Sequence, residues 1–73
     1  MEKKGYRENL QILTDMFPGK IAISVKEAAS AIGANQDTVY DAIKRKFNPL
    51  PAQHLSKKKI VIPLASFARW LSL

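Results

Sequence analysis

The chain has 73 residues, a formal net charge of +6 at neutral pH and no cysteine. A chain of this length has room for one domain with a small core, which buries only about 60% of its unfolded surface. The lack of cysteine excludes disulfides and thiolate metal sites, and one histidine with six carboxylates is too few for a metal cluster. We therefore expect no metal and no cofactor. No apolar run approaches the ~20 residues that span a membrane, and no secretory signal is recognisable, so we expect a cytoplasmic protein.

The positive charge is concentrated in the second half of the chain. Residues 1–33 carry five cations and four anions, whereas residues 34–73 carry seven cations and two anions. The net charge is thus +1 in the first part and +5 in the second. This distribution favours a polyanionic partner, with DNA ahead of an acidic protein or a membrane surface. Charge alone leaves open the simpler interpretation that the lysines only keep the surface soluble.

The first 25 residues predict one helix and one short extended segment. Apolar residues recur at spacings of four, three and four, and they form one stripe of a helix from Tyr6 to Phe17. Pro18 and Gly19 end this helix. Alternating apolar residues then predict an extended segment or edge strand before Val25. The two apolar sets are Tyr6, Leu10, Leu13 and Phe17 for the helix, and Ile21, Ile23 and Val25 for the strand.

Two short helices separated by a tight turn follow. Ser24 and Glu27 have the spacing of a capping box, in which each side chain bonds the other residue's backbone amide. Gly33 ends this helix at positive φ. Asn35 is a good N-cap for the next helix, which we expect to extend to Lys46. Such a pair is typical of a helix-turn-helix, whose second helix lies in the DNA major groove.

The second of these helices has an apolar face and a polar face. The polar face carries Asp37 and Asp41, whose charges repel phosphates. We expect these acids to pair with Lys44 and Arg45 at helical spacing, which leaves Lys46 and the lysines at 57–59 as the main anchors for a polyanion. The apolar face, predicted to be buried, consists of Val39, Ala42, Ile43 and Phe47.

The remaining residues predict a β-hairpin and a last helix. Gln53–Leu55 and Ile60–Pro63 are candidate strands joined by Ser56–Lys59, and Ile60 and Ile62 are placed to face the core. Pro63 suits the first turn of a helix that we expect to extend to Leu73. The apolar face of this helix consists of Leu64, Phe67, Trp70 and Leu71.

Together these elements predict a mainly α fold with a small β-hairpin wing, which is a winged helix-turn-helix with three to four helices. We expect residues 1–19 to form the N-terminal helix and its exit, and residues 20–73 to form the winged domain. Both parts belong to one globular domain. The tip of the wing carries Lys57, Lys58 and Lys59, which can contact phosphates without reading sequence. A solvated turn is the simpler alternative.

Other polar residues of the second helix can contact bases. Gln36 and Tyr40 lie one turn apart, and glutamine can bond an adenine bidentately while tyrosine bonds a phosphate or stacks. Thr38 can bond a phosphate near the start of the helix. The predicted DNA-binding residues are Gln36, Thr38, Tyr40, Lys44, Arg45, Lys46, Lys57, Lys58 and Lys59.

From about Ile23 to Leu71, roughly two thirds of its length, the chain resembles the excisionase-type DNA-binding domains. These domains are relatives of the winged helix-turn-helix of MerR-type regulators. The segments that carry the resemblance are, in order, Ile23–Ala29, the turn at Gly33, Thr38–Tyr40, Ile43–Arg45, Leu50–Ala52, Ile60–Pro63 and Phe67–Leu71.

The resemblance implies a small protein that binds double-stranded attachment-site DNA of a phage or conjugative element. Such proteins are recombination directionality factors, which often bend DNA and help an integrase catalyse excision. The resemblance further implies a place on the nucleoid in the bacterial cytoplasm, an integrase or other recombinase as partner, and self-association on DNA. It puts Gln36, Thr38, Tyr40 and Lys44 at the major groove and Lys57–Lys59 on the wing.

Two other functions remain open at this point. The same scaffold serves transcriptional regulators, in which the first helix would form a dimer. A protein-interaction module without DNA binding would account for the acids of the second helix and for the C-terminal aromatic residues. We expect no enzymatic activity, because the sequence has no nucleophile–base pair, phosphate-binding loop or ligand set.

Overall fold

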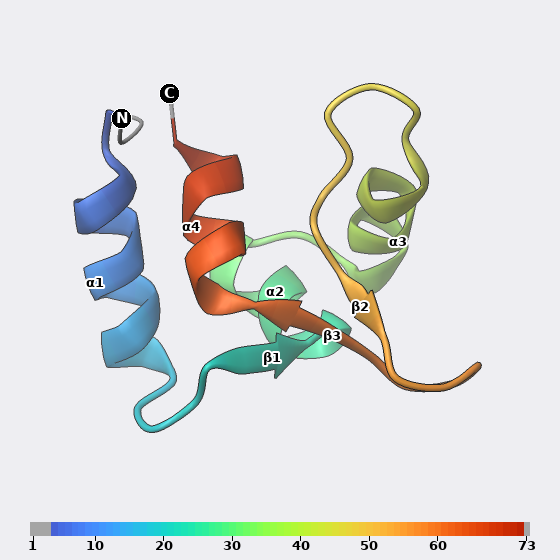
Figure 1. The fold of residues 1–73 in the computed structure, drawn as a ribbon, viewed down its shortest axis with the longest axis horizontal. Helices are drawn as coiled ribbons and strands as arrows, with labels where there is room; N and C mark the ends of the chain where they lie inside the picture. The colour runs from blue at the N-terminus through green and yellow to red at the C-terminus, as the bar shows by residue number, and fades with distance from the viewer. Residues whose placement is uncertain (1–3, 73) are drawn as a thin grey trace.

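The computed structural model describes residues 4–72, in which four helices combine with a three-stranded antiparallel sheet (Figure 1). The sheet has one strand more than the predicted hairpin, because the extended segment after the first helix pairs with it. The fold is therefore mixed α/β. In chain order the elements are α1 (Tyr6–Met16), β1 (Ala22–Ser24), α2 (Val25–Ile32), α3 (Gln36–Lys44), β2 (Gln53–His54), β3 (Ile60–Pro63) and α4 (Leu64–Leu71).

Strand β3 lies at the centre of the sheet and pairs with both other strands, in the order β1-β3-β2. Ile23 of β1 lies opposite Ile62 of β3, and both side chains are buried in the core. On the other side, Gln53 of β2 lies opposite Val61. Beyond this pair, the Leu55 amide donates a hydrogen bond to the Lys59 carbonyl at 2.8 Å. The register of β2 against β3 therefore determines which residues form the turn between these strands.

Both ends of α2 and the start of α3 are capped as the sequence predicts. The Ser24 hydroxyl accepts a hydrogen bond from the Glu27 amide, and the Glu27 carboxylate accepts one from the Ser24 amide, both at 3.0 Å. Gly33, at φ 71°, ends α2 in the left-handed region. The Asn35 side chain accepts from the Thr38 amide at 2.8 Å. These bonds satisfy backbone groups that helix ends leave free, so the short connection between the helices is well defined.

Helix α1 packs along α4, on the side of the molecule away from α3 (Figure 1). Leu13 is buried at this contact. The Asn9 side chain donates a hydrogen bond to the Ser72 hydroxyl at 3.1 Å, and the Arg69 guanidinium lies 5.7 Å from the centre of the Tyr6 ring. This arrangement leaves the α3 side of the fold uncovered by α1.

The core takes side chains from all four helices and from β1 and β3. Phe67, Ile23, Ile62 and Val39 are its largest fully buried side chains. Burial of each such side chain contributes about 1.5–3 kcal/mol to folding. Val39 anchors α3, and its burial leaves the opposite face of that helix to solvent.

Three side chains from the predicted apolar stripes are exposed, and Phe47 is the one among them that the sequence predicts to be buried. Ile21 is 89% exposed, because β1 begins one residue later and Ile21 belongs to the preceding turn. Phe47 is 88% exposed, because α3 ends at Lys44, earlier than predicted. Leu71 lies in the last turn of α4 and is 36% exposed.

Helix α3 ends early because a residue beyond the helix donates the hydrogen bond that a further helical turn would otherwise supply. The Ala42 carbonyl accepts from the Leu50 amide at 3.0 Å, and the Leu50 side chain is buried. Leu50, rather than Phe47, therefore enters the core.

Two further element boundaries differ from the prediction. Strand β2 ends at His54, so Leu55 lies outside it. Helix α4 ends at Leu71, and the predicted end at Leu73 lies outside the described residues. Within residues 4–72, no helix has both the length and the apolar character needed to cross a membrane.

Candidate nucleic-acid interface

A groove on the α3 side of the molecule brings together two parts of the predicted site. Its volume is about 270 Å³, and it lies between α3, the start of α2, and the turn and strand β3 of the hairpin. Gln36 and Tyr40 come from α3, while Lys58 and Lys59 come from the hairpin. The complete lining is Ser24, Val25, Lys26, Gln36, Tyr40, Lys58, Lys59, Ile60 and Val61.

Gln36 and Tyr40 share this groove because they lie one turn apart on α3. The buried Val39 fixes the rotation of the helix, and both groove residues remain exposed. Thr38 is placed differently. Its hydroxyl donates a hydrogen bond to the Asn35 side chain at 2.9 Å and so takes part in the helix cap.

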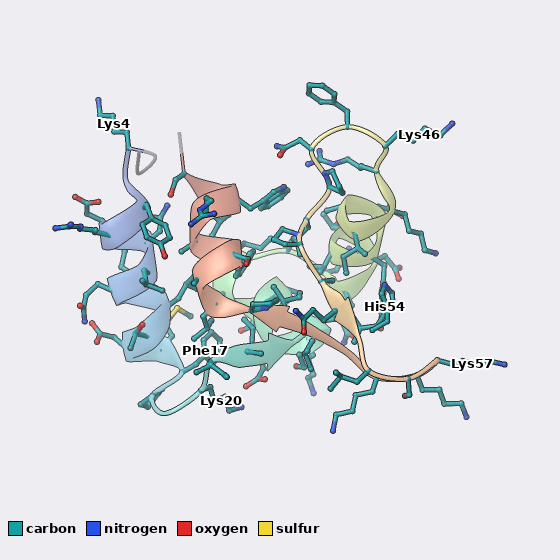
Figure 2. All side chains as sticks on the ribbon, viewed as in Figure 1. Lys4, Phe17, Lys20, Lys46, His54 and Lys57 are labelled. Carbon is teal, nitrogen blue, oxygen red and sulfur yellow. The ribbon has the colours of Figure 1, made fainter. Side chains whose placement is uncertain are left out.

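The turn between β2 and β3 presents three consecutive lysines to solvent. The Lys59 amide donates to the Ser56 hydroxyl at 3.1 Å, which closes the turn. Lys58 and Lys59 line the groove, whereas Lys57 points outward from the tip (Figure 2). The turn therefore presents Lys58 and Lys59 to a ligand in the groove and Lys57 to the solvent outside the groove.

The three cations at the end of α3 lie outside the groove lining. Lys44 is the last residue of the helix and is exposed. The Arg45 guanidinium lies 5.5 Å from the centre of the Trp70 ring and donates a hydrogen bond to the Asn48 carbonyl at 3.3 Å. Lys46 and Lys57 lie at opposite ends of the α3 side, and Lys4 lies at the far edge of the molecule (Figure 2).

The predicted pairing of the α3 acids with the cations that follow them is wrong. Within the described part of the chain, no ion pair joins Asp37 or Asp41 to Lys44 or Arg45. Arg45 is held instead by an aromatic ring and a backbone carbonyl, which helical spacing alone could not indicate.

An ion pair forms next to the groove, at the start of α2. Lys20 lies 2.6 Å from a carboxylate oxygen of Glu27, the residue that also closes the capping box with Ser24. The Lys20 ammonium, and then the Ser24 amide, hold the pKa of Glu27 below its usual value of 4.5. Glu27 therefore stays ionised and holds the turn where α2 begins beside the groove.

Among residues 4–72, no acidic side chain lines the groove, and the second half of the chain is basic. Residues 42–73 contain seven cations and no carboxylate. Phosphate groups near the groove would therefore meet lysines, although Asp37 and Asp41, which do not line the groove, directly follow Gln36 and Tyr40 on α3.

Comparison of the chain with protein-family models, curated proteins and solved structures found no match.

Two polar residues of the groove lining were not predicted as site residues from the sequence. Lys26 and Ser24 lie at the start of α2, and the prediction treated that segment only as a helix cap. The signal for Lys26 was its place in the first turn of a helix, where a cation opposes the helix dipole and has no structural benefit. Lys26 adds a third cation to the groove lining, from an element other than the hairpin.

Proposed function

We propose that this chain binds double-stranded DNA as a winged helix-turn-helix accessory factor of the excisionase kind. In this proposal α2 and α3 are the helix-turn-helix, and the hairpin of β2 and β3 is the wing. The observation that carries it is the shared groove, in which Gln36 and Tyr40 of α3 lie beside Lys58 and Lys59 of the hairpin. A helix that reads bases and a hairpin that holds the adjacent backbone must act on the same side of a fold.

The side chains of the groove divide by the DNA groups that they suit. Lys26, Lys58 and Lys59 suit phosphates, because an ammonium on a flexible stem contacts the backbone whatever the base sequence. Gln36 suits the edge of an adenine, which offers one donor and one acceptor in the major groove. Tyr40 suits a phosphate oxygen or the face of a base. The lysines thus supply affinity and the α3 residues supply sequence preference.

The chain acts without catalysis of its own in this proposal. It occupies attachment-site DNA of a phage or conjugative element on the bacterial nucleoid, where an integrase is its partner. Copies of the chain assemble side by side on that DNA. The groove residues only contact DNA in this proposal.

Salt dependence of DNA binding tests the proposal, with the chain titrated into a fluorescent duplex of random sequence. With about five phosphate contacts, the slope of log affinity against log salt concentration is expected near −4 to −5. Lys58→Ala should reduce the magnitude of the slope by about 0.9 and weaken all sequences alike. Lys4→Ala removes the same charge from the far edge of the molecule and should leave the slope unchanged. Equal effects of the two variants would contradict the proposal.

Sequence preference is tested separately, on a duplex enriched from a random pool by the wild-type chain. Gln36→Ala should lower the ratio of affinities for the enriched and random duplexes, by roughly tenfold for a lost bidentate contact. Its salt slope should stay that of the wild type, since no charge is removed. A chain that ignores duplex DNA at low salt would overturn the proposal.

A further inference from the structure

Phe47 is the most exposed aromatic side chain of the described residues, at 88%. It lies in the loop between α3 and β2, directly after Lys44, Arg45 and Lys46. Single exposed apolar residues are common on protein surfaces, so exposure alone carries no argument. Phe47 is distinguished by the contacts that hold its loop and by the cations that precede it.

The loop that presents Phe47 is braced on the residue after it. Asn48 adopts the left-handed conformation, with φ 50°. Its carbonyl accepts one hydrogen bond from Trp70 at 3.0 Å and another from Arg45 at 3.3 Å. The Arg45 guanidinium also lies over the Trp70 ring. These contacts tie the loop to α4, so Phe47 projects from a fixed backbone.

A second contact of this loop, with α3, explains why Phe47 stays out of the core. Leu50 is buried and takes the hydrogen bond of the Ala42 carbonyl, so the chain returns to the core after Phe47 rather than through it. The exposed ring is thus a consequence of the hydrogen bonds that the loop makes with α3 and α4.

The charges around Phe47 indicate which kind of partner its ring contacts. Three cations precede Phe47 and no carboxylate follows it anywhere in residues 48–73. The loop lies at the end of the α3 side occupied by Lys46, and the lysine turn lies at the other end (Figure 2). A duplex placed along α3 therefore meets a cationic turn at one end of the helix and a cationic loop with an exposed ring at the other.

Proteins that contact the minor groove frequently insert an apolar side chain between base steps, which unstacks the bases and kinks the helix axis. We propose that Phe47 is such a wedge. In this proposal α3 lies in the major groove of the DNA, and Phe47 inserts between stacked base pairs beside it and bends the DNA. Arg45 and Trp70 position the wedge, and Lys46 holds the adjacent phosphate. This inference depends on the proposed function, since the ligand of both is duplex DNA.

The test measures bending and unstacking apart from binding. The enriched duplex carries a fluorophore at each end for energy transfer, and 2-aminopurine is placed in turn at each base step. Binding of the wild type should shorten the end-to-end distance and raise 2-aminopurine fluorescence at one step. Phe47→Ala should abolish both signals and weaken binding by roughly tenfold, with the salt slope unchanged.

Two variants serve as controls. Ile21→Ala removes an equally exposed apolar side chain from another part of the surface, and it should bend DNA as the wild type does. Phe47→Leu keeps an apolar side chain and should restore part of the bend. Thermal melting of the Phe47 variants should match the wild type, because the side chain lies outside the core.

The outcomes separate the two proposals. If Phe47→Ala binds and bends the duplex as the wild type does, the wedge is wrong while DNA binding stands. If the wild type binds with the expected salt slope but leaves the duplex straight and stacked, the wedge is also wrong. If the wild type does not bind duplex DNA at low salt, both proposals fail.

Discussion

The indole nitrogen of Trp70 donates a hydrogen bond to the backbone carbonyl of Asn48 at 3.0 Å, across 22 positions of sequence. Trp70 belongs to α4, and Asn48 belongs to the loop after α3. The Trp70 ring also lies 6.4 Å from the ring of Phe67, which is fully buried. The bond therefore connects the loop that ends the candidate interface to the centre of the core.

Trp70→Phe should loosen this loop. Phenylalanine keeps an aromatic ring beside Phe67 but cannot donate to the Asn48 carbonyl, so the loss is one net hydrogen bond, about 0.5–1.5 kcal/mol. For a domain of this size, about 1 kcal/mol lowers the melting temperature by roughly 4–8 °C. Thermal melting followed by circular dichroism measures the change. An unchanged melting temperature would show that the bond contributes nothing to the fold.

Ser24→Ala should destabilise the start of α2. The hydroxyl accepts the Glu27 amide, and removing a serine N-cap costs about 0.5–2 kcal/mol. Urea unfolding should show a lower midpoint with the same slope. Ser30→Ala is the matched control, because Ser30 is an exposed serine within the same helix and caps nothing. Equal midpoints for the two variants would contradict the role of the cap.

Stability should fall in acid partly through Glu27. The pKa of Glu27 is lower in the folded chain than its ordinary value of 4.5, first because of the bond from Lys20 and then because of the Ser24 amide. A carboxyl with a lowered folded pKa contributes stability that is present above the unfolded pKa and is lost as the pH falls through the folded pKa. Urea midpoints should therefore decrease below about pH 4.5.

Glu27→Gln isolates this contribution. Glutamine can still accept from the Ser24 amide, as capping boxes allow, but it cannot titrate or pair with Lys20. The variant should lose less stability than the wild type between neutral pH and pH 3. Identical acid profiles for the two proteins would show that Glu27 has no part in the pH dependence.

Ile23→Ala and Ile21→Ala should differ sharply, although the residues are two positions apart. Ile23 is 1% exposed and lies opposite Ile62 in the sheet, so its truncation should cost about 2–5 kcal/mol. Ile21 is 89% exposed, and its truncation should stay within about 0.5 kcal/mol. Chemical unfolding of both variants measures the difference. Comparable losses would mean that the strand is placed out of register.

The features that the sequence predicted well are those decided within a few residues. The capping box of Ser24 and Glu27 and the Asn35 cap each depend on a side chain and a backbone group within one turn, and the left-handed conformation of Gly33 depends on its lack of a Cβ. The residue types at these positions therefore indicate the local structure directly.

The features that the sequence missed are decided by distant residues. Helical spacing grouped Phe47 with Val39, but the Leu50 amide and the Trp70 indole draw the chain out of the helix before Phe47. Pairing between β1 and β3 likewise joins segments about 40 positions apart, which no local pattern specifies. The sequence predicted separately the helix residues and the lysine turn of the candidate interface, but not Lys26.

Backbone amide shifts recorded during titration with a random duplex at low salt test the central claim most directly. If the groove is the DNA surface, the largest shifts should fall on Lys26, Gln36, Tyr40, Lys58 and Lys59 and should shrink together as salt is added. Residues of α1 should hardly move, because that helix lies on the other side of the molecule. Shifts centred on α1, or none in the groove at saturating DNA, would contradict the claim.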